Sequence, residues 1–394
     1  MLKKVLVLLM ALVMVFSFAA CNNDGDPDPT TTTTTTPDDI TIGAVMDLTG
    51  ALSGIGGPIR DGVVLAIEQI NAAGGINGAE VKLIVEDGKT DPTAGFEAVK
   101  KLATVNQVKV IIGPMISGAV MAAGQWAADN GVLLISPSAT SPDIAQQAWR
   151  QFVFRTASTD AVQGTAMARI IAEAGYQKVA IIVQDNQYGT GIGEEVRNRV
   201  GAGKVVSFIK YDPVKLDYLT ELQQIKAQNP DVIVHAGYQD DAQAIFRQAA
   251  QVGLGTAQWI TSEGVKADRT LEDAAAAAFM KDHVIGTNPV APEGLAIADT
   301  FAQQYTARFN NAPGTYADTV YDATNLALQA MKNVGATNAT QIAAEVLRIA
   351  KDYPGVSGTI TFDQYGDRTT AIFEVWKVVQ DGAGFKYEQV RILS

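Results

Sequence analysis

Residues 108–142 of the 394-residue chain read VKVIIGPMISGAVMAAGQWAADNGVLLISPSATSP. Two short runs rich in Val, Ile and Leu, at 108–112 and 132–135, enclose a segment of small and apolar residues, 117–130, that suits a helix. Runs of β-branched residues bounded by glycine are typical of parallel strands that are buried on both faces. This stretch therefore predicts a strand–helix–strand unit of an α/β fold.

The same alternation continues in both directions from this unit. Towards the N-terminus it predicts strands at 40–48 and 81–85, a helix at 58–71, and a helix opened by Asp91-Pro92. A second series predicts strands at 179–183, 205–209, 232–234 and 258–261 and helices at 161–174, 191–200, 218–228 and 241–251. Helices at 293–309, 319–333 and 341–349 and strands at 359–362, 372–379 and 387–393 complete the chain. Two such series predict two doubly wound parallel-sheet lobes.

Composition excludes several classes of function. Hydrophobic residues make up 47% of the chain and charged residues 18%, which is enough for a folded core. The net charge of −12 argues against binding to nucleic acid, which needs clustered Lys and Arg. The single cysteine, Cys21, excludes an intramolecular disulfide and a thiolate zinc cluster. The two histidines, His235 and His283, are not spaced as metal ligands, so we expect no metal or cofactor.

The N-terminal segment is typical of an export signal. A lysine pair is followed by an apolar run at 5–16, too short to span a membrane comfortably, and by small residues directly before Cys21. Residues 1–20 resemble a bacterial lipoprotein signal, which implies a lipid on Cys21, although Phe18 stands where such signals usually carry Leu. An unlipidated signal peptide is the alternative. Residues 21–39, with seven consecutive threonines, predict a flexible tether.

The loops that follow the predicted strands carry the candidate binding residues, because open parallel sheets bind ligands beyond the carboxyl ends of their strands. Ser117 offers a hydroxyl and nearby free N–H groups to a carboxylate, but taken alone it is more simply a helix cap. Thr140 offers a hydroxyl between two prolines, and a binding role and a turn are equally good interpretations. Tyr188 offers an aromatic face. Glu263 offers a partner for an ammonium group, although an exposed loop acid is the simpler explanation of one such residue.

Taken in order, these loops and several further motifs resemble one protein family. The motifs include the residues at 66–78, Asp91-Pro92, the segments 112–114, 138–142 and 154–156, and Glu263-Gly264. Over residues 40–394 the chain resembles the type I periplasmic binding proteins of the branched-chain amino-acid (Leu/Ile/Val) transport class. The ordered set of motifs is specific for the family and less so for the ligand.

The resemblance assigns roles to individual positions. It implies that Ser117 and the segment Ser138, Ala139 and Thr140 bind the carboxylate of the ligand. It also implies that Tyr238 and Glu263 contact the α-ammonium side, and that Tyr188 is an aromatic of the cleft. Small residues at 53–56 stand where the family often has an aromatic side chain, which indicates a larger or differently shaped pocket.

The resemblance also implies a domain organisation and a function. Lobe 1 would comprise residues 40–156 plus 288–365, and lobe 2 residues 157–287 plus 366–394, with the ligand in the cleft between them. The chain would cross between the lobes near residues 157, 287 and 365, and the lobes would close on the ligand by a hinge motion. We expect an exported, lipid-anchored, monomeric substrate-binding component of an ABC transporter. It would deliver an amino acid to a membrane permease.

Three alternatives remain at this stage. An enzyme is not favoured, because the sequence has no Gly-x-x-x-x-Gly-Lys-Ser/Thr phosphate loop and no Gly-x-Ser-x-Gly elbow. A ligand-sensing lipoprotein with the same fold is an open alternative; no membrane helix is seen near the C-terminus, so signalling would need a separate membrane protein. The ligand is also open, since another amino acid, an amide or an aromatic acid would suit the same scaffold.

Overall fold

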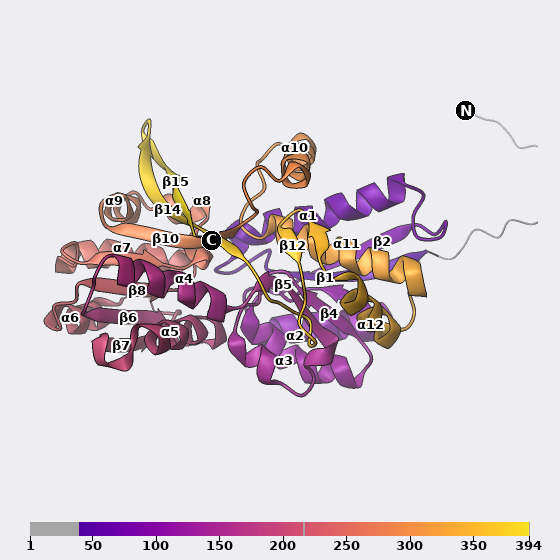
Figure 1. The fold of residues 1–394 in the computed structure, drawn as a ribbon, viewed down its shortest axis with the longest axis horizontal. Coiled ribbons are helices and arrows are strands. Elements are labelled where there is room, and N and C mark those ends of the chain that lie inside the picture. Colours follow the sequence, from indigo (N-terminus) through magenta and orange to yellow (C-terminus); the bar gives the residue numbers. More distant parts are fainter. Residues whose placement is uncertain (1–38, 216, 394) are drawn as a thin grey trace, which may run out of the picture. The chain divides into compact units, whose positions relative to one another are not determined.

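The first of two large sheets contains the strands whose apolar runs mark the N-terminal third of the chain (Figure 1). The computed structural model describes residues 39–215 and 217–393. The strand order is β13-β5-β4-β3-β1-β2, and every pairing is parallel. The strands are β1 (Ile40–Met46), β2 (Val81–Asp87), β3 (Val110–Ile112), β4 (Leu133–Ser136), β5 (Val153–Ser158) and β13 (Asp367–Arg368).

The second sheet has the order β15-β14-β10-β9-β8-β6-β7. Its strands are β6 (Val179–Gln184), β7 (Val205–Tyr211), β8 (Val232–Ala236), β9 (Gln258–Thr261), β10 (Val284–Val290), β14 (Ile372–Asp381) and β15 (Gly384–Leu393). The five strands from β6 to β10 pair in parallel, and β14 and β15 add an antiparallel edge. A short hairpin, β11 (Tyr353–Gly355) and β12 (Gly358–Ile360), stands apart from both sheets.

Helices cover both faces of each sheet, so strand residues are buried on both sides. In β1, Ala44 and Met46 pack on the face shared with α1 (Ser53–Ala72), α11 (Ala317–Val334) and α12 (Ala339–Ile349). Val45 packs on the opposite face against α2 (Pro92–Thr104) and α3 (Ser117–Asp129). This alternation is the period-two pattern of a strand, and burial on both faces explains the continuous apolar runs.

The second sheet is covered in the same way. Helices α4 (Asp160–Glu173) and α5 (Gln187–Val200) cover one face, and α6 (Leu219–Ala227), α7 (Gln239–Val252) and α9 (Ala274–His283) cover the other. The remaining helices are α8 (Asp268–Leu271), α10 (Ala296–Phe309) and four 3-10 helices, Pro142–Gln146, Arg150–Phe152, Ala202–Lys204 and Glu263–Val265. The two layered α/β sheets confirm the predicted fold class.

The chain passes between the sheets after β5, after β10 and after β13. β10 belongs to the second sheet as far as Val290, and β13 keeps the chain in the first sheet as far as Arg368. The described residues form one compact unit. The division into lobes with boundaries near 157, 287 and 365 therefore stays a prediction at the level of single residues.

Among the helices that begin earlier than the sequence indicated, three have their early turn at the cavity described below. Helix α1 begins at Ser53, not at residue 58, so Pro58 lies inside the helix. This start requires glycine at position 56, because a Cβ there would lie 1.9 Å from the Asp47 carbonyl oxygen. Helix α5 begins at Gln187, where the Asn186 side chain caps it by accepting from the Gly189 N–H at 2.8 Å. Helix α7 begins at Gln239, two residues early.

The predicted signal peptide at 1–20, Cys21 and the tether at 21–39, except for Asp39, lie outside the described residues. Among the described helices, none combines the length and the apolar character needed to cross a bilayer. The cap at Asp91 is confirmed: its carboxylate accepts from the Ala94 N–H at 2.7 Å, and Pro92 is the first helical residue.

Candidate ligand-binding site

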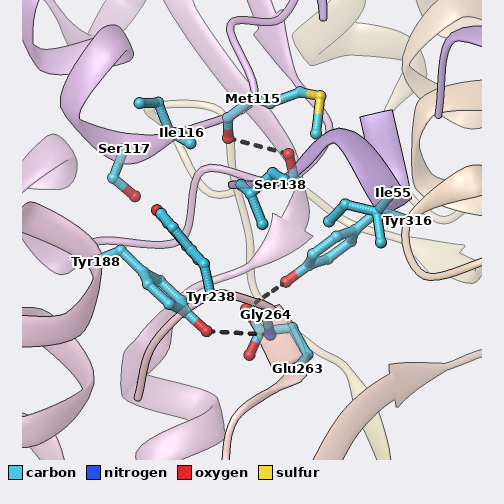
Figure 2. Close-up of a pocket in the computed structure, with 11 residues that line it drawn as sticks. Ile55, Met115, Ile116, Ser117, Ser138, Tyr188, Tyr238, Glu263, Gly264 and Tyr316 are labelled. Carbon is cyan, nitrogen blue, oxygen red and sulfur yellow. Dashed lines mark hydrogen bonds between the residues drawn. The ribbon is translucent and has the colours of Figure 1, made fainter. Parts of the chain in front are cut away.

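A small cavity lies where the loops at the carboxyl ends of both sheets meet (Figure 2). Its volume is about 20 Å³, roughly room for one water molecule. The walls come from both parts of the chain: Leu52, Ile55, Met115, Ile116, Ser117, Ser138, Tyr188, Tyr238, Glu263, Gly264 and Tyr316. Five of the seven predicted ligand-binding residues are in this set. An organic ligand enters only if the walls move apart.

Ser117 is the first residue of α3, but it does not cap that helix. The N-cap position is Ile116, and the Ser117 hydroxyl oxygen instead accepts from the backbone N–H groups of Thr140 at 3.2 Å and Ser141 at 3.1 Å. The simple cap interpretation is therefore wrong. Because the oxygen already accepts two hydrogen bonds, its own proton is available to donate to a group in the cavity.

The segment that follows β4 reaches the cavity through some of its residues only. Ser138 lines the cavity and donates to the Met115 carbonyl at 3.0 Å. Thr140 is buried beside Ser117, and its hydroxyl oxygen has no hydrogen-bond partner within the described part of the chain. Ala139 packs into the core of the first sheet, and its N–H donates to the Ser136 hydroxyl at 3.0 Å. The structure thus brings Ser117, Ser138 and Thr140 together and leaves the Ala139 side chain outside.

Tyr188 and Tyr238, which come from helix starts that pack on the second sheet, form an aromatic wall of the cavity. Their rings are stacked, with centroids 5.3 Å apart and planes 15° apart, and both side chains are buried. The Tyr188 hydroxyl donates to the Ser262 hydroxyl at 2.8 Å and accepts from the Gly264 N–H at 3.3 Å. Tyr238 sits just before α7, where its N–H donates to Asp241 at 3.2 Å. The Tyr188 hydroxyl therefore fixes its ring against the loop that carries Glu263, and the Tyr238 ring stacks on it.

Glu263 is buried, not an exposed loop acid. Its carboxylate accepts from the Tyr316 hydroxyl at 3.0 Å, and the second oxygen, Oε2, has no hydrogen-bond partner among the described residues. Burial raises the pKa of this carboxyl above its usual value. A buried carboxylate oxygen without a donor is costly, and a cation in the cavity would offset that cost.

A second buried acid, Asp160, was missed by the sequence reasoning. It is the first residue of α4 and is fully buried, and neither carboxylate oxygen has a hydrogen-bond partner within the described chain. Burial, then the nearby charge of Glu263, raises its pKa well above the usual value. Its N–H donates to the Thr140 carbonyl at 2.9 Å, which ties the acid to the serine and threonine side of the site. An acid at a helix start is so commonly a capping residue that its position carries no separate signal of binding.

A buried arginine supports the segment that carries Thr140. Arg155 in β5 is fully buried and forms a bidentate ion pair with Asp367 of β13, at 2.6 and 2.7 Å. It also donates to the carbonyls of Ala139 at 3.3 Å and Ser141 at 2.8 Å. The Arg155 guanidinium therefore holds the loop that carries Thr140 through two of its carbonyls. The partner acid, Asp367, lies more than two hundred residues away in the sequence.

The remaining wall is apolar. Leu52 and Ile55 come from the start of α1, and Met115 and Ile116 from the loop before α3. The sequence reasoning saw only small residues near position 55; the early start of α1 instead directs Leu52 and Ile55 inward. The cavity wall thus has hydroxyl groups, one acid, two aromatic rings and an aliphatic surface, and the second acid, Asp160, is buried close by.

The described residues hold no cluster of three His, Cys, Asp or Glu side chains that could bind a metal ion. His235 lies inside β8, where burial lowers its pKa to about 3, so the ring is neutral. It lies between the Tyr211 hydroxyl at 3.1 Å and the Thr261 hydroxyl at 2.9 Å. This histidine therefore lies inside a strand, one residue beyond the predicted strand at 232–234.

Comparison with known proteins places the chain among binding proteins. The family model for periplasmic binding proteins matches residues 39–383. The leucine-, isoleucine-, valine-, threonine- and alanine-binding protein of Pseudomonas aeruginosa is 30% identical over 351 residues, 87% of this chain and 91% of that protein. The Leu/Ile/Val-binding protein of Escherichia coli is 28% identical over 335 residues, 84% of this chain and 88% of that protein.

Among solved structures, one similar protein is a branched-chain amino-acid transporter substrate-binding protein from Streptococcus pneumoniae, in complex with isoleucine. The two chains share 26% identity with a TM-score of 0.76, over 89% of this chain and all of that one. The similarity to this structure and to the two sequence relatives extends over most of the described fold. The chain belongs to the periplasmic binding protein family and has its type I fold.

Proposed function

We propose that this protein is the extracytoplasmic substrate-binding component of an ABC transporter and that it binds an amino acid in the cavity between its two sheets. The observation that carries the proposal is the placement of opposite chemistries in one cavity. The hydroxyls of Ser117 and Ser138 line one side of the cavity and the buried Glu263 lines the other, with Thr140 and Asp160 buried close by. This arrangement matches the carboxylate and ammonium groups of one α-amino acid.

Ser117 and Thr140 bind the ligand carboxylate in this proposal. Ser117 has a proton to donate, because its oxygen already accepts from two backbone N–H groups. The Thr140 hydroxyl lies next to the Asp160 carboxyl, whose pKa it lowers, and makes no full hydrogen bond among the described residues. Ser138 lies beside them and lines the same wall. Nearly complete burial of Ser117 and Thr140 makes each bond to a charged carboxylate stronger than it would be in water.

Glu263 and Asp160 bind the ligand ammonium. Three carboxylate oxygens of these two residues have no hydrogen-bond donor within the described chain: both of Asp160 and one of Glu263. An ammonium group has three N–H donors, so one ligand group offers as many donors as there are unpaired oxygens. Tyr188 and Tyr238 then pack their stacked rings beside the ligand.

The aliphatic wall of Leu52, Ile55, Met115 and Ile116 suits an apolar side chain, which favours a branched-chain or related amino acid. The printed names of the relatives from Pseudomonas aeruginosa and Escherichia coli support the same class of ligand. Closure of the two lobes on this ligand, by a hinge at the three crossings, would enclose it in a cavity wider than the one seen here. A membrane permease would then receive the ligand, and we expect no catalysis.

The test is a ligand screen on the compact unit that begins at Pro37. Melting temperatures are measured with each of the twenty amino acids and with matched compounds that lack either the ammonium or the carboxylate group. A ligand at a hundredfold excess over its Kd adds about 2.7 kcal/mol of stability. We expect the melting temperature to rise with aliphatic amino acids and to stay unchanged with the matched compounds. Shifts confined to non-amino-acid ligands would contradict the proposal.

Membrane attachment is tested separately, on the full chain. We propose that Cys21 carries a lipid and that residues 21–39 tether the body to the outer face of the cell membrane. Cys21→Ser should move the protein from the membrane fraction to the soluble extracytoplasmic fraction, while ligand binding stays unchanged. Retention of the variant in the membrane fraction would refute the lipid anchor.

A further inference from the structure

A second set of contacts, away from the ligand cavity, joins the two parts of the chain. Helix α1 packs on the first sheet, whereas α7 and α8 belong to the part around the second sheet (Figure 1). Arg269 in α8 donates through Nη1 to the Ser53 hydroxyl at the start of α1, at 3.0 Å. Neither residue is among those that line the ligand cavity. This hydrogen bond therefore connects the two parts at a place that a bound ligand does not reach.

Arg269 is held in position by its own part of the chain. Its guanidinium forms a bidentate ion pair with Asp240, the second residue of α7, through Nε at 2.7 Å and Nη2 at 3.1 Å. The Arg269 carbonyl accepts from the Gln243 side chain at 2.5 Å. A planar guanidinium that is fixed at two of its nitrogens has little freedom left to lose. The third nitrogen, Nη1, is thereby aimed at Ser53, and the bond between them costs little further side-chain entropy.

The side chain of Gln239, the first residue of α7, lies against the first turn of α1 beside this bond. It is fully buried, and neither its oxygen nor its nitrogen has a hydrogen-bond partner among the described residues. A Cβ at position 54 would lie 2.4 Å from Gln239 Oε1, so only a glycine there leaves the amide its present place. Burying an amide without partners is unfavourable. Moving α1 away from α7 would return this amide to water.

The two contacts therefore act in opposite directions on closure. The bond between Arg269 and Ser53 exists only while α1 lies next to α8, so it favours the closed arrangement. The Gln239 amide is deprived of partners only while α1 covers it, so it favours opening. A closed state that is stabilised and penalised at one place has a moderate stability, which suits a protein that must later release its ligand.

We propose that Ser53, Arg269 and Gln239 form a latch that sets the affinity of this protein for every ligand it accepts. The inference rests on the proposed closure of the two lobes around a ligand. It adds residues that control affinity through the stability of the closed arrangement, without contacting the ligand. Apparent affinity falls in proportion to the population of the binding-competent arrangement, so a change in the latch multiplies every Kd by one factor. Selectivity among ligands stays the same.

The test measures the Kd of leucine, valine and alanine by calorimetry for the native chain and two variants. Ser53→Ala removes the bond to Arg269 and keeps the ion pair with Asp240. It should raise all three Kd values by a common factor of about three to ten. Gln239→Met keeps the length of the side chain and removes the unpaired amide. It should lower all three Kd values by a common factor of similar size.

A double-mutant cycle supplies the control. In an Arg269→Ala background, Ser53→Ala should have no further effect on any Kd, because its partner is already gone. Stopped-flow kinetics separate the latch from a folding defect. The latch forms after the ligand has entered, so Ser53→Ala should speed dissociation and leave the association rate unchanged, and Gln239→Met should slow dissociation.

The outcomes separate the two proposals. Common factors of opposite direction for Ser53→Ala and Gln239→Met support the latch. If the native chain binds leucine but both variants keep the native Kd values, the latch is refuted and the proposed function stands. Unequal factors for the three amino acids would also refute the latch, since they would place these residues in contact with the ligand. If only a ligand that is not an amino acid binds, the proposed function is refuted, and the same variants measured with that ligand decide the latch.

Discussion

Replacing Glu263 by glutamine tests the proposed ammonium site without changing its shape. The glutamine side-chain oxygen can still accept from the Tyr316 hydroxyl, which lies 3.0 Å from the present carboxylate. The change removes the negative charge and replaces an unpaired oxygen with an N–H₂ group that has no acceptor in the ligand ammonium. A hydrogen bond to a charged group contributes about 1.5–3 kcal/mol. We therefore expect the Kd for the preferred amino acid to rise roughly 10- to 150-fold.

Stability and pH dependence separate this effect from misfolding. Burial raises the folded-state pKa of Glu263, so the stability linked to this group is present at low pH and is lost as the pH rises through that pKa. Removing the charge should therefore leave the melting temperature at pH 8 unchanged or higher, even though binding weakens. Affinity in the native chain should fall as the pH is lowered and Glu263 gains a proton, and the variant should show a smaller fall.

Isothermal titration calorimetry at several pH values measures both effects. Glu272→Gln is the matched control, because it removes the same charge from an exposed position nine residues away. That control should bind like the native chain. A native-like Kd for Glu263→Gln would refute the assignment of Glu263 to the ligand ammonium, and a lower melting temperature at pH 8 would refute the account of its burial.

Four further predictions concern charged side chains, three of them buried. Asp160→Asn should weaken the binding of amino acids but not the binding of analogues that lack the ammonium group, as measured by calorimetry. Burial raises the pKa of Asp47 to about 7, so its contribution to stability is lost as the pH rises from about 4 to about 7. Asp47→Asn should flatten the part of that loss that lies between pH 5 and pH 8, worth up to about 3 kcal/mol, in urea titrations at those two pH values. Asp367→Asn should cost about 3–5 kcal/mol of unfolding free energy, because it leaves the buried Arg155 guanidinium uncompensated. Removing the exposed Arg348 from its ion pair should leave the urea midpoint nearly unchanged.

The fold could be predicted from the sequence because most strands are buried on both faces and appear as uninterrupted apolar runs. The runs at 110–112 and 133–135 are examples, and both are central strands of the first sheet. Strand β5 was not apparent from its sequence pattern, because it contains Arg155 and ends in small polar residues. Arginine suits a buried strand here because Asp367 pairs with it and the carbonyls of Ala139 and Ser141 accept from it. The contact with Asp367, more than two hundred residues away in the sequence, leaves no local signal.

The site was predictable where a residue directly follows a strand. Ser117, Tyr188 and Glu263 were found in this way, because the topology of a parallel sheet brings those loops to one edge. Tyr316 follows no strand and enters the cavity from a loop before a helix, so the same rule could not find it. Ile55 was missed because glycines and Pro58 obscured the start of α1, which is set by the close approach of Gly56 to the Asp47 carbonyl.

The buried acids link recognition of the ligand to closure of the cavity. Glu263 and Asp160 come from the second sheet's part of the chain, whereas Tyr316 and Ser117 come from the part around the first sheet. Bringing these surfaces together removes the acids from water, which is costly unless a cation meets them. A ligand ammonium offsets that cost only in the closed arrangement, so its binding energy shifts the equilibrium toward closure. A carboxylic acid without an ammonium group gains the bonds to Ser117 and Thr140 but leaves both acids unpaired. Selectivity for amino acids over simple acids then follows from the cost of closing around unpaired carboxylates.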